Sequence, residues 1–324
     1  MSYQVSTTWQ QLLADNKLID SALQVLAGSD YVVQWGERHP ERAAELIASR
    51  DLLCVYDAEH YSSNLMKLLV DVADETALQQ QLRYYRQREM VRIIWRDLAG
   101  WADLAETVRE LSSLADACIQ QSARILHQWL AADFGEPYNA QGEAQQLVVL
   151  AMGKLGAGEL NLSSDVDLIF TYPDDGETQG GPRELSNEEF FTRLGRKLVQ
   201  SLDNLTVDGF VFRVDMRLRP FGESGALAAS FGALEDYYQT QGREWERYAM
   251  IKVRPITGSE AAKKELMDLL RPFVYRRYLD YGVFDSLREM KGMIAEQLQR
   301  KGMEDNIKLG AGGIREIEFI GQVF

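Results

Sequence analysis

The sequence predicts an α+β protein, in which a long helical region precedes a small core of strands and helices, after which helices resume. Apolar residues recur at helical spacing over roughly the first 130 positions. Strand-forming runs are confined to the middle of the chain, at residues 147–152 and 168–170. Helical spacing returns after Ser259. We therefore expect three parts: a helical region at 1–135, a core at 136–258, and the start of a second helical region at 259–324.

The first part contains three apolar stripes of helical spacing, at residues 9–26, 82–98 and 108–130. Each is followed within a few positions by a glycine, which is a common end to a helix. Such stripes usually pack into a core, and we interpret them so. Residues 134–146 (FGEPYNAQGEAQQ) are polar and contain glycine and proline, so we place the first boundary there.

The core opens with the segment AMGKLGAGELNLSSDVDLIFTY. Residues 147–152 predict a buried strand, and a second strand begins around Asp165 and Asp167. Alternate residues of a strand share a face, so both carboxylates point the same way while Val166 and Leu168 point into a core. A hard divalent cation prefers such oxygen ligands. The alternative from this pattern alone is a solvated loop ahead of an ordinary strand.

A third acid lies in residues 211–219 (VFRVDMRLR), which alternate as a strand does. Phe212, Val214, Met216 and Leu218 form the apolar row, and Asp215 lies in the other row with Val211 and three arginines. Alone, this strand could be a soluble sheet edge. Beside Asp165 and Asp167, it indicates a three-carboxylate metal site surrounded by arginines that bind phosphate.

The connecting segments are also informative. Residues 173–187 form a Gly- and Pro-rich loop beside the expected site, either a mobile cover or a disordered connection. Ser186 and Glu189 form a capping box that starts a helix through Leu202. Residues 234–252 again show helical spacing.

Several other chemistries are excluded. The glycines read GxxGxG, which is neither the dinucleotide fingerprint nor the Walker pattern. No calcium loop follows Asp167. His39, His60 and His127 are widely spaced and do not form a zinc motif, so we interpret them as ordinary residues.

The net charge of −14 argues against binding to nucleic acid. Residues 206–256, however, contain seven acids and seven bases, whereas the rest contains 42 acids and 28 bases. This locally arginine-rich region suits a compact anion such as a nucleotide. No secretory signal or membrane-spanning run is present, and Cys54 and Cys118 are expected to be buried, reduced thiols. We expect a cytoplasmic protein that does not bind membranes.

Four blocks together resemble the glutamine synthetase adenylyltransferases, specifically their N-terminal, deadenylylating half. They are GKLGAGELNLSSDVDLIF (153–170), GFVFRVDMRLRPFGESG (209–225), REWERYAMIKVRP (243–255) and GAGGIREIEFIGQVF (310–324). The resemblance implies a polymerase-beta-like nucleotidyltransferase core, a small mixed sheet with flanking helices. It also implies that phosphate removes AMP from an adenylylated tyrosine of glutamine synthetase, releasing ADP.

The resemblance further implies that Asp165, Asp167 and Asp215 are catalytic and bind two Mg2+ ions. Lys154 and the backbone amides after Gly153 are candidates for binding the adenylyl phosphate, with Ser163 or Ser164 adding a hydroxyl unless these serines only cap the turn. Six bases are candidates for inorganic phosphate, of which we expect half to be structural instead: Arg213, Arg217, Arg243, Arg247, Lys252 and Arg254.

The chain is shorter than the family's proteins, so we expect the N-terminal portion of a longer protein, without the adenylylating site. Two alternatives remain open. The same site could adenylylate the tyrosine from ATP, or the chain could be an inactive regulatory module that binds glutamine synthetase or a PII-type signal protein.

Overall fold

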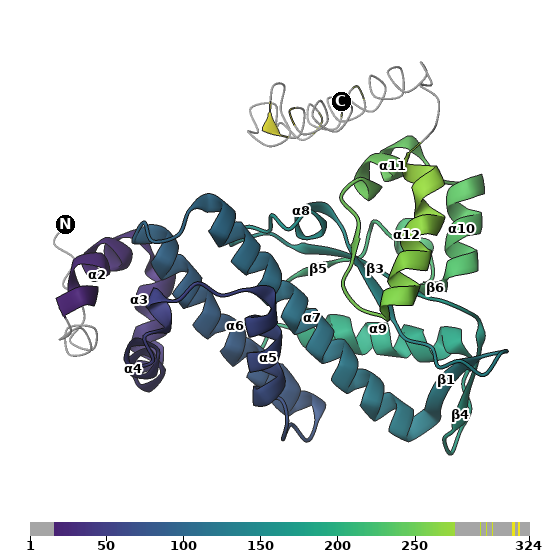
Figure 1. Ribbon diagram of the computed structural model, residues 1–324, viewed down its shortest axis with the longest axis horizontal. Helices are drawn as coiled ribbons and strands as arrows, with labels where there is room; N and C mark the ends of the chain where they lie inside the picture. Colours follow the sequence, from purple (N-terminus) through teal and green to yellow (C-terminus); the bar gives the residue numbers. More distant parts are fainter. Residues whose placement is uncertain are drawn as a thin grey trace.

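The computed structural model describes residues 16–275 and six isolated later positions, 292, 296, 300, 313, 314 and 317. Within them the fold is α+β, as the sequence predicts, with small sheets flanked by helices (Figure 1). Residues 9–15 of the first apolar stripe lie outside the described residues, as do most of the predicted last helical region and nearly all of the 310–324 block. The division at 135 and 258 stays a prediction.

The described N-terminal part is helical throughout. Its elements are α2 (Asn16–Gly28), α3 (Asp30–Arg38), α4 (Pro40–Ala48), the short 3-10 helix η1 (Asp51–Leu53), α5 (Ala58–Leu68), α6 (Glu75–Leu98) and α7 (Leu104–Phe134). Polar caps start several of them: Asp57, Asp74 and Asp103 each accept a hydrogen bond from a backbone N–H of the first turn. The expected glycine stops are confirmed, since Gly28 ends α2 and Gly135 follows α7.

The main sheet has five strands in the order β5–β3–β2–β7, with β6 also paired to β3. They are β2 (Val148–Ala151), β3 (Val166–Tyr172), β5 (Val214–Asp215), β6 (Ala228–Ser230) and β7 (Arg254–Pro255). β3 runs antiparallel to β2 but parallel to β5 and β6, so the sheet is mixed. β5 pairs with the start of β3, and β6 with its end.

Both faces of the main sheet are covered. Val149 of β2 and Leu168 of β3 pack into the larger core with α6, α7 and α9 (Asn187–Asp203). Val148 and Ile169 pack into a second core with α10 (Phe231–Thr240), α11 (Glu244–Met250) and α12 (Glu260–Val274). Alternate side chains of each strand thus enter different cores, which is why these strands read as continuous apolar runs.

Two segments expected to be irregular form a second, two-stranded sheet. β1 (Gly135–Asn139) lies in the proposed boundary segment and pairs antiparallel with β4 (Gly176–Gly180), which lies in the predicted loop at 173–187. The loop is therefore not a disordered connection. It also does not lie beside the aspartates, because it follows the far end of the seven-residue strand β3, about 20 Å from its start.

Other differences are local. The strand expected at 211–219 is reduced to two residues, and Val211, expected in the charged row, is fully buried. The helical stretch at 234–252 is divided into α10 and α11 around Gly242, where a Cβ would meet the Phe273 ring. Cys118 is buried as expected, but Cys54 is exposed; both are free thiols. Ser186 caps α9 as predicted.

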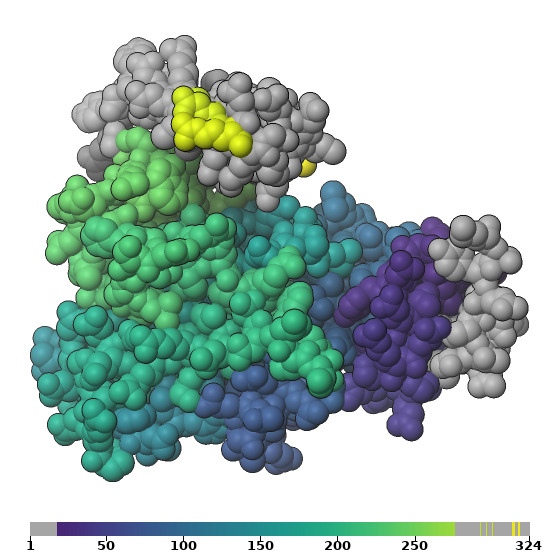
Figure 2. Space-filling model, turned by 180° about the vertical axis from the view of Figure 1, so that it is seen from behind, coloured from purple at the N-terminus to yellow at the C-terminus, as the bar shows by residue number. Residues whose placement is uncertain are grey.

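Figure 2 shows helices α2–α4, in purple, and the segment of α10–α12, in green, on opposite sides of the molecule. Segments of the central sheet and its loops lie between them. Among the described helices, none has the length and apolar character needed to cross a bilayer.

Candidate functional site

Two of the three predicted aspartates, Asp167 and Asp215, are paired at the start of β3. β3 and β5 pair in register, with Val166 opposite Val214 and Asp167 opposite Asp215. Paired residues on neighbouring strands point to the same face, about 4.8 Å apart. Asp165 lies two positions before Asp167, whereas Val166 and Leu168 are fully buried beneath them, as the alternation predicts. Two aspartates far apart in sequence are thus neighbours in the sheet.

Arginines hold two of these carboxylates. Arg213 Nε donates to Asp165 and its Nη2 donates to the Ser163 carbonyl at 2.7 Å. Arg217 Nε lies 2.9 and 3.0 Å from the two carboxylate oxygens of Asp215, and its backbone N–H donates to Asp215 Oδ1 at 2.8 Å. Among the described residues, no three His, Cys, Asp or Glu side chains stand close enough together to hold a metal ion.

The Arg217 contacts set the charge of Asp215. Hydrogen bonds from the Arg217 side chain lower the pKa of Asp215 below its ordinary value of 3.8, although partial burial acts in the other direction. The same hydrogen bond raises the pKa of Arg217, and Asp167 adds a smaller contribution of the same sign. Asp215 is therefore ionised at neutral pH, as a metal ligand must be.

The Gly-Lys turn approaches the aspartates closely. Short helix α8 (Gly153–Gly156) follows β2, and Gly153 has a φ of +54°, which favours glycine. A Cβ on Gly153 would lie 2.8 Å from Asp167 Oδ2. The absent side chain therefore makes room for this carboxylate against the turn. Lys154, in the same helix, is half-buried.

The two serines belong to the turn before β3. The Ser164 hydroxyl donates to Asn161 Oδ1 at 2.6 Å, and its backbone N–H donates to the Asn161 carbonyl. This geometry is that of a turn, the second interpretation considered from sequence. Ser163 is exposed and contacts Arg213 through its carbonyl.

The remaining bases lie in different surroundings. Arg247 is buried, pairs with Glu244 at 2.6 Å and donates to the Phe273 carbonyl at 2.8 Å. Lys252 pairs with Glu159 at 2.5 Å. Arg243 is exposed and precedes α11, where its backbone N–H donates to Glu246.

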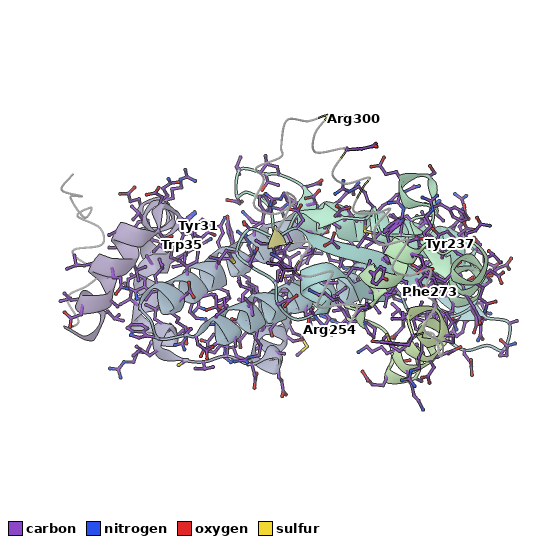
Figure 3. All side chains as sticks on the ribbon, turned by 90° about the horizontal axis from the view of Figure 1, so that it is seen from above. Tyr31, Trp35, Tyr237, Arg254, Phe273 and Arg300 are labelled. Carbon is purple, nitrogen blue, oxygen red and sulfur yellow. The ribbon has the colours of Figure 1, made fainter. Side chains whose placement is uncertain are left out.

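Arg254 joins the long helix α7 to the Gly-Lys turn. Its guanidinium donates to both oxygens of Asp116 at 2.7 and 3.1 Å, and to the carbonyls of Leu155 and Gly156 at 2.9 and 3.2 Å. In Figure 3 it lies between Tyr31 and Trp35 at one end of the molecule and Tyr237 and Phe273 at the other. Asp116 was missed from sequence, where an acid within an apolar helical stripe is the only signal.

The donor set suits a hard divalent cation. Asp165, Asp167 and Asp215 carry carboxylate oxygens near one end of β3 and β5, and Gly153 leaves space beside Asp167. The side chains of Asp165 and Arg213 are about half exposed, at 51% and 54%, so this pair can exchange partners with solvent. The metal assignment itself stays a prediction.

Comparisons with known proteins identify the family. Residues 19–268 match the family model described as glutamate-ammonia ligase adenylyltransferase, and residues 288–324 match one described as GlnD PII-uridylyltransferase. Curated relatives bear the name bifunctional glutamine synthetase adenylyltransferase/adenylyl-removing enzyme. Identity is 55% to the protein of Nitrosococcus oceani, covering 95% of this chain and 32% of the relative. It is 55% to that of Pseudomonas aeruginosa, covering 93% and 31%, and 52% to that of Hahella chejuensis, covering 97% and 33%.

The chain spans about a third of the length of these relatives. The first match covers most of the described helices and the whole main sheet, including Asp165, Asp167 and Asp215. By this match and these identities, the chain belongs to the glutamate-ammonia ligase adenylyltransferase family.

Proposed function

We propose that this chain catalyses removal of AMP from an adenylylated tyrosine of glutamine synthetase by inorganic phosphate, releasing ADP. The observation that carries the proposal is the pairing of Asp167 with Asp215 at the start of β3, with Asp165 two positions away. The relatives' name includes the adenylyl-removing activity. The likeness of the 153–170 and 209–225 blocks to the deadenylylating half of that family supports this direction.

In this reaction an oxygen of inorganic phosphate attacks the adenylyl phosphorus, and the bond from phosphorus to the tyrosine oxygen breaks. The phosphate becomes the terminal phosphate of ADP. The phenolate leaves and takes up a proton, which restores the tyrosine. Because the pKa of a tyrosine hydroxyl is about 10, the phenolate is a moderate leaving group.

Asp165, Asp167 and Asp215 would hold the divalent cations, for which we propose two Mg2+ ions. Bound there, the ions would offset the negative charge of phosphate and adenylyl group. Arg213 and Arg217 adjoin these acids and would orient the anions, and Lys154 and the amides after Gly153 would contact the adenylyl phosphate. Arg247 and Arg254 would have a structural role instead, because their guanidiniums already donate hydrogen bonds to protein carboxylates and carbonyls.

The test is an assay of ADP release from adenylylated glutamine synthetase in the presence of phosphate and Mg2+. Asp167→Asn removes one proposed ligand while preserving the size of the side chain. We expect at least about a 10²–10³-fold lower rate, the scale on which loss of one electrostatic contact to a transition state is felt. Asp236→Asn, on the exposed face of α10, is the matched control and should keep the parent rate. A folded Asp167→Asn protein with near-parent turnover would reject the assignment.

The opposite direction is the second candidate, because the relatives' name also includes adenylyltransferase. Unmodified glutamine synthetase with ATP, assayed for AMP transfer by the same preparation, separates the two. A regulatory module without activity would fail both assays and would bind no nucleotide in a Mg2+-dependent manner.

The match of residues 288–324 to a PII-uridylyltransferase model suggests a PII-type protein as a regulatory partner. We place the reaction in the cytoplasm, since glutamine synthetase is the proposed substrate.

A further inference from the structure

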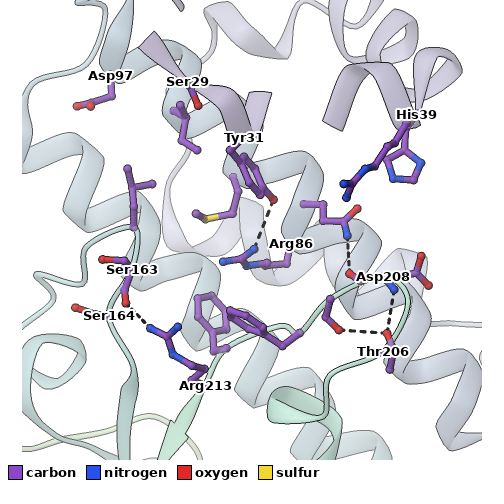
Figure 4. A pocket seen from close by; sticks show the side chains of 18 of the residues that line it. Ser29, Tyr31, His39, Arg86, Asp97, Ser163, Ser164, Thr206, Asp208 and Arg213 are labelled. Atoms are coloured by element: carbon purple, nitrogen blue, oxygen red, sulfur yellow. Dashed lines mark hydrogen bonds between the residues drawn. The ribbon is translucent and has the colours of Figure 1, made fainter. Parts of the chain in front are cut away.

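A cavity of about 770 Å³ lies between the N-terminal helices and the loops that carry the site residues (Figure 4). Its walls come from α2, α3 and α6 on one side and from the segments around 162–164 and 206–213 on the other. Arg213, which holds Asp165, is one of the lining residues. The cavity therefore adjoins the proposed catalytic centre without including any of its three aspartates.

Arg86, in this wall, forms no salt bridge with a carboxylate among the described residues. Arg86 Nη1 donates a long hydrogen bond, 3.5 Å, to the Tyr31 hydroxyl. Its Nε is buried and has no hydrogen-bond partner within the described part of the chain. The neighbouring Gln87 donates to the Asp208 carbonyl, but its Oε1 is likewise buried without a partner there. A half-buried guanidinium with unused donors is stabilised by an anion.

The charged residues that line the cavity favour an anion. Arg38, Arg86 and Arg213 line the cavity against two acids, Asp97 and Asp208. Asp97 already accepts a hydrogen bond from the Thr107 hydroxyl at 2.9 Å. The excess of guanidinium charge contrasts with the net charge of −14 for the whole chain.

Aromatic rings line the same cavity. The Arg86 guanidinium lies 5.5 Å from the centre of the Phe210 ring, and that of Arg213 lies 5.6 Å from it. Phe210 thus lies near both guanidiniums, and Tyr31 of α3 lines the same cavity. A flat ring between such side chains gains apolar contact while its acidic group meets the guanidiniums.

We propose that this cavity binds a small ring-bearing oxyanion, a phosphate or a carboxylate, through Arg86 and Arg213, with its ring against Phe210 and Tyr31. Arg213 is shared between this ligand and Asp165. A bound ligand would therefore weaken the hydrogen bond from Arg213 to Asp165. The cavity could thus affect Asp165 although Asp165 does not line it.

The proposal is tested by titration calorimetry of the whole chain, in EDTA, with phenyl phosphate and with benzoate as separate probes. Binding of phenyl phosphate identifies the phosphate form of the ligand, and binding of benzoate the carboxylate form. Arg86→Gln should raise the dissociation constant of the bound probe about tenfold or more, since a charge-assisted pair is lost. Arg124→Gln is the control, because the hydrogen bonds of Arg124 within the described residues go to Gln121 and Gln128 on α7 and Arg124 does not line the cavity.

Arg213→Gln repeats the test at an exposed position, where loss of folding is not expected, and should weaken binding to a similar extent. Crystals soaked with the bound probe should show it between Arg86 and Arg213. Absence of binding by both probes overturns the proposal. Binding that is equally strong in the parent, Arg86→Gln and Arg213→Gln proteins also overturns it. Because no turnover is measured, failure here is distinguishable from failure of the proposed reaction.

Discussion

At the scale of single residues, the central feature is how arginines hold the acids. Arg217 lies two residues after Asp215 in the sequence. It donates hydrogen bonds to Asp215 from both its side chain and its backbone N–H. Arg213 reaches Asp165 from a different strand-forming segment. The Arg217 pair lowers the pKa of Asp215, and because Arg213 and Arg217 are exposed, both pairs cost little to break. Both acids thus have arginine partners that a metal cation could replace.

Replacing Arg217 should therefore change the titration of Asp215. In Arg217→Gln the main cause of the lowered pKa is gone, so the pKa of Asp215 should rise toward 3.8 or above it, since partial burial remains. Carboxyl-carbon NMR titration of Asp215 measures this. Arg219→Gln is the comparison, because Arg219 donates to the carbonyls of Met216 and Glu223 rather than to Asp215. An unchanged pKa of Asp215 in Arg217→Gln would contradict the account.

The sign for stability follows from the lowered pKa. In the parent, this pair stabilises the fold above pH 3.8, the ordinary value, and the contribution is lost as pH falls through the lower folded pKa of Asp215. Since the Arg217 side chain is 73% exposed, the contribution is expected to be under about 1 kcal/mol. Arg217→Gln should be nearly as stable as the parent and differ from it least in strong acid.

At the scale of elements, the Gly-Lys turn is held in place from outside the sheet. Arg254 at the start of β7 bonds the carbonyls of α8 and the Asp116 carboxylate of α7. Gly156 allows this packing, because a Cβ there would meet the Lys252 carbonyl at 1.9 Å. Burial raises the pKa of Asp116, and the Arg254 guanidinium opposes that shift. The contact therefore orders the turn and keeps a poorly solvated acid charged.

Arg254→Met should destabilise the protein by about 1–3 kcal/mol, because it leaves a mostly buried carboxylate without its cation. The free energy of unfolding is measured with urea at pH 7. The loss should shrink as pH falls, when Asp116 takes up a proton in the variant and no longer needs a partner. Arg271→Met, at an exposed position of α12 with a 3.9 Å pair to Asp268, should change the stability by less than about 0.5 kcal/mol. Equal losses in both variants would contradict this role of Arg254.

Local sequence patterns predicted some of the helices and strands but not others. Strand β3 and helix α9 follow from alternation, spacing and the Ser186 cap, because their own residues decide both shape and burial. β1 and β4 were not predicted, since their polar and glycine-rich residues become strands only by pairing with each other. The contact of Arg254 with Asp116 spans 138 positions, and nothing local to either residue indicates it.

At the scale of the whole molecule, one mixed sheet separates two cores and brings Asp215 to the end of β3 where Asp165 and Asp167 lie. The sequence predicted these three acids as site residues. The alignment of Asp167 with Asp215, however, depends on the parallel pairing of β3 and β5. Between β3 and β5 the chain passes through α9, whose apolar face packs in one core with α7. The N-terminal helical part thus contacts the segment that leads to Asp215, although it contributes no residue to the trio.

The most direct test of the central claim is anomalous diffraction from crystals grown with Mn2+, with adenylylated tyrosine peptide or ADP present. The account predicts manganese density in contact with the carboxylates of both Asp167 and Asp215, and its loss in Asp215→Asn. Density that touches neither aspartate, or that is unchanged in Asp215→Asn, would contradict the claim that these acids form one metal site.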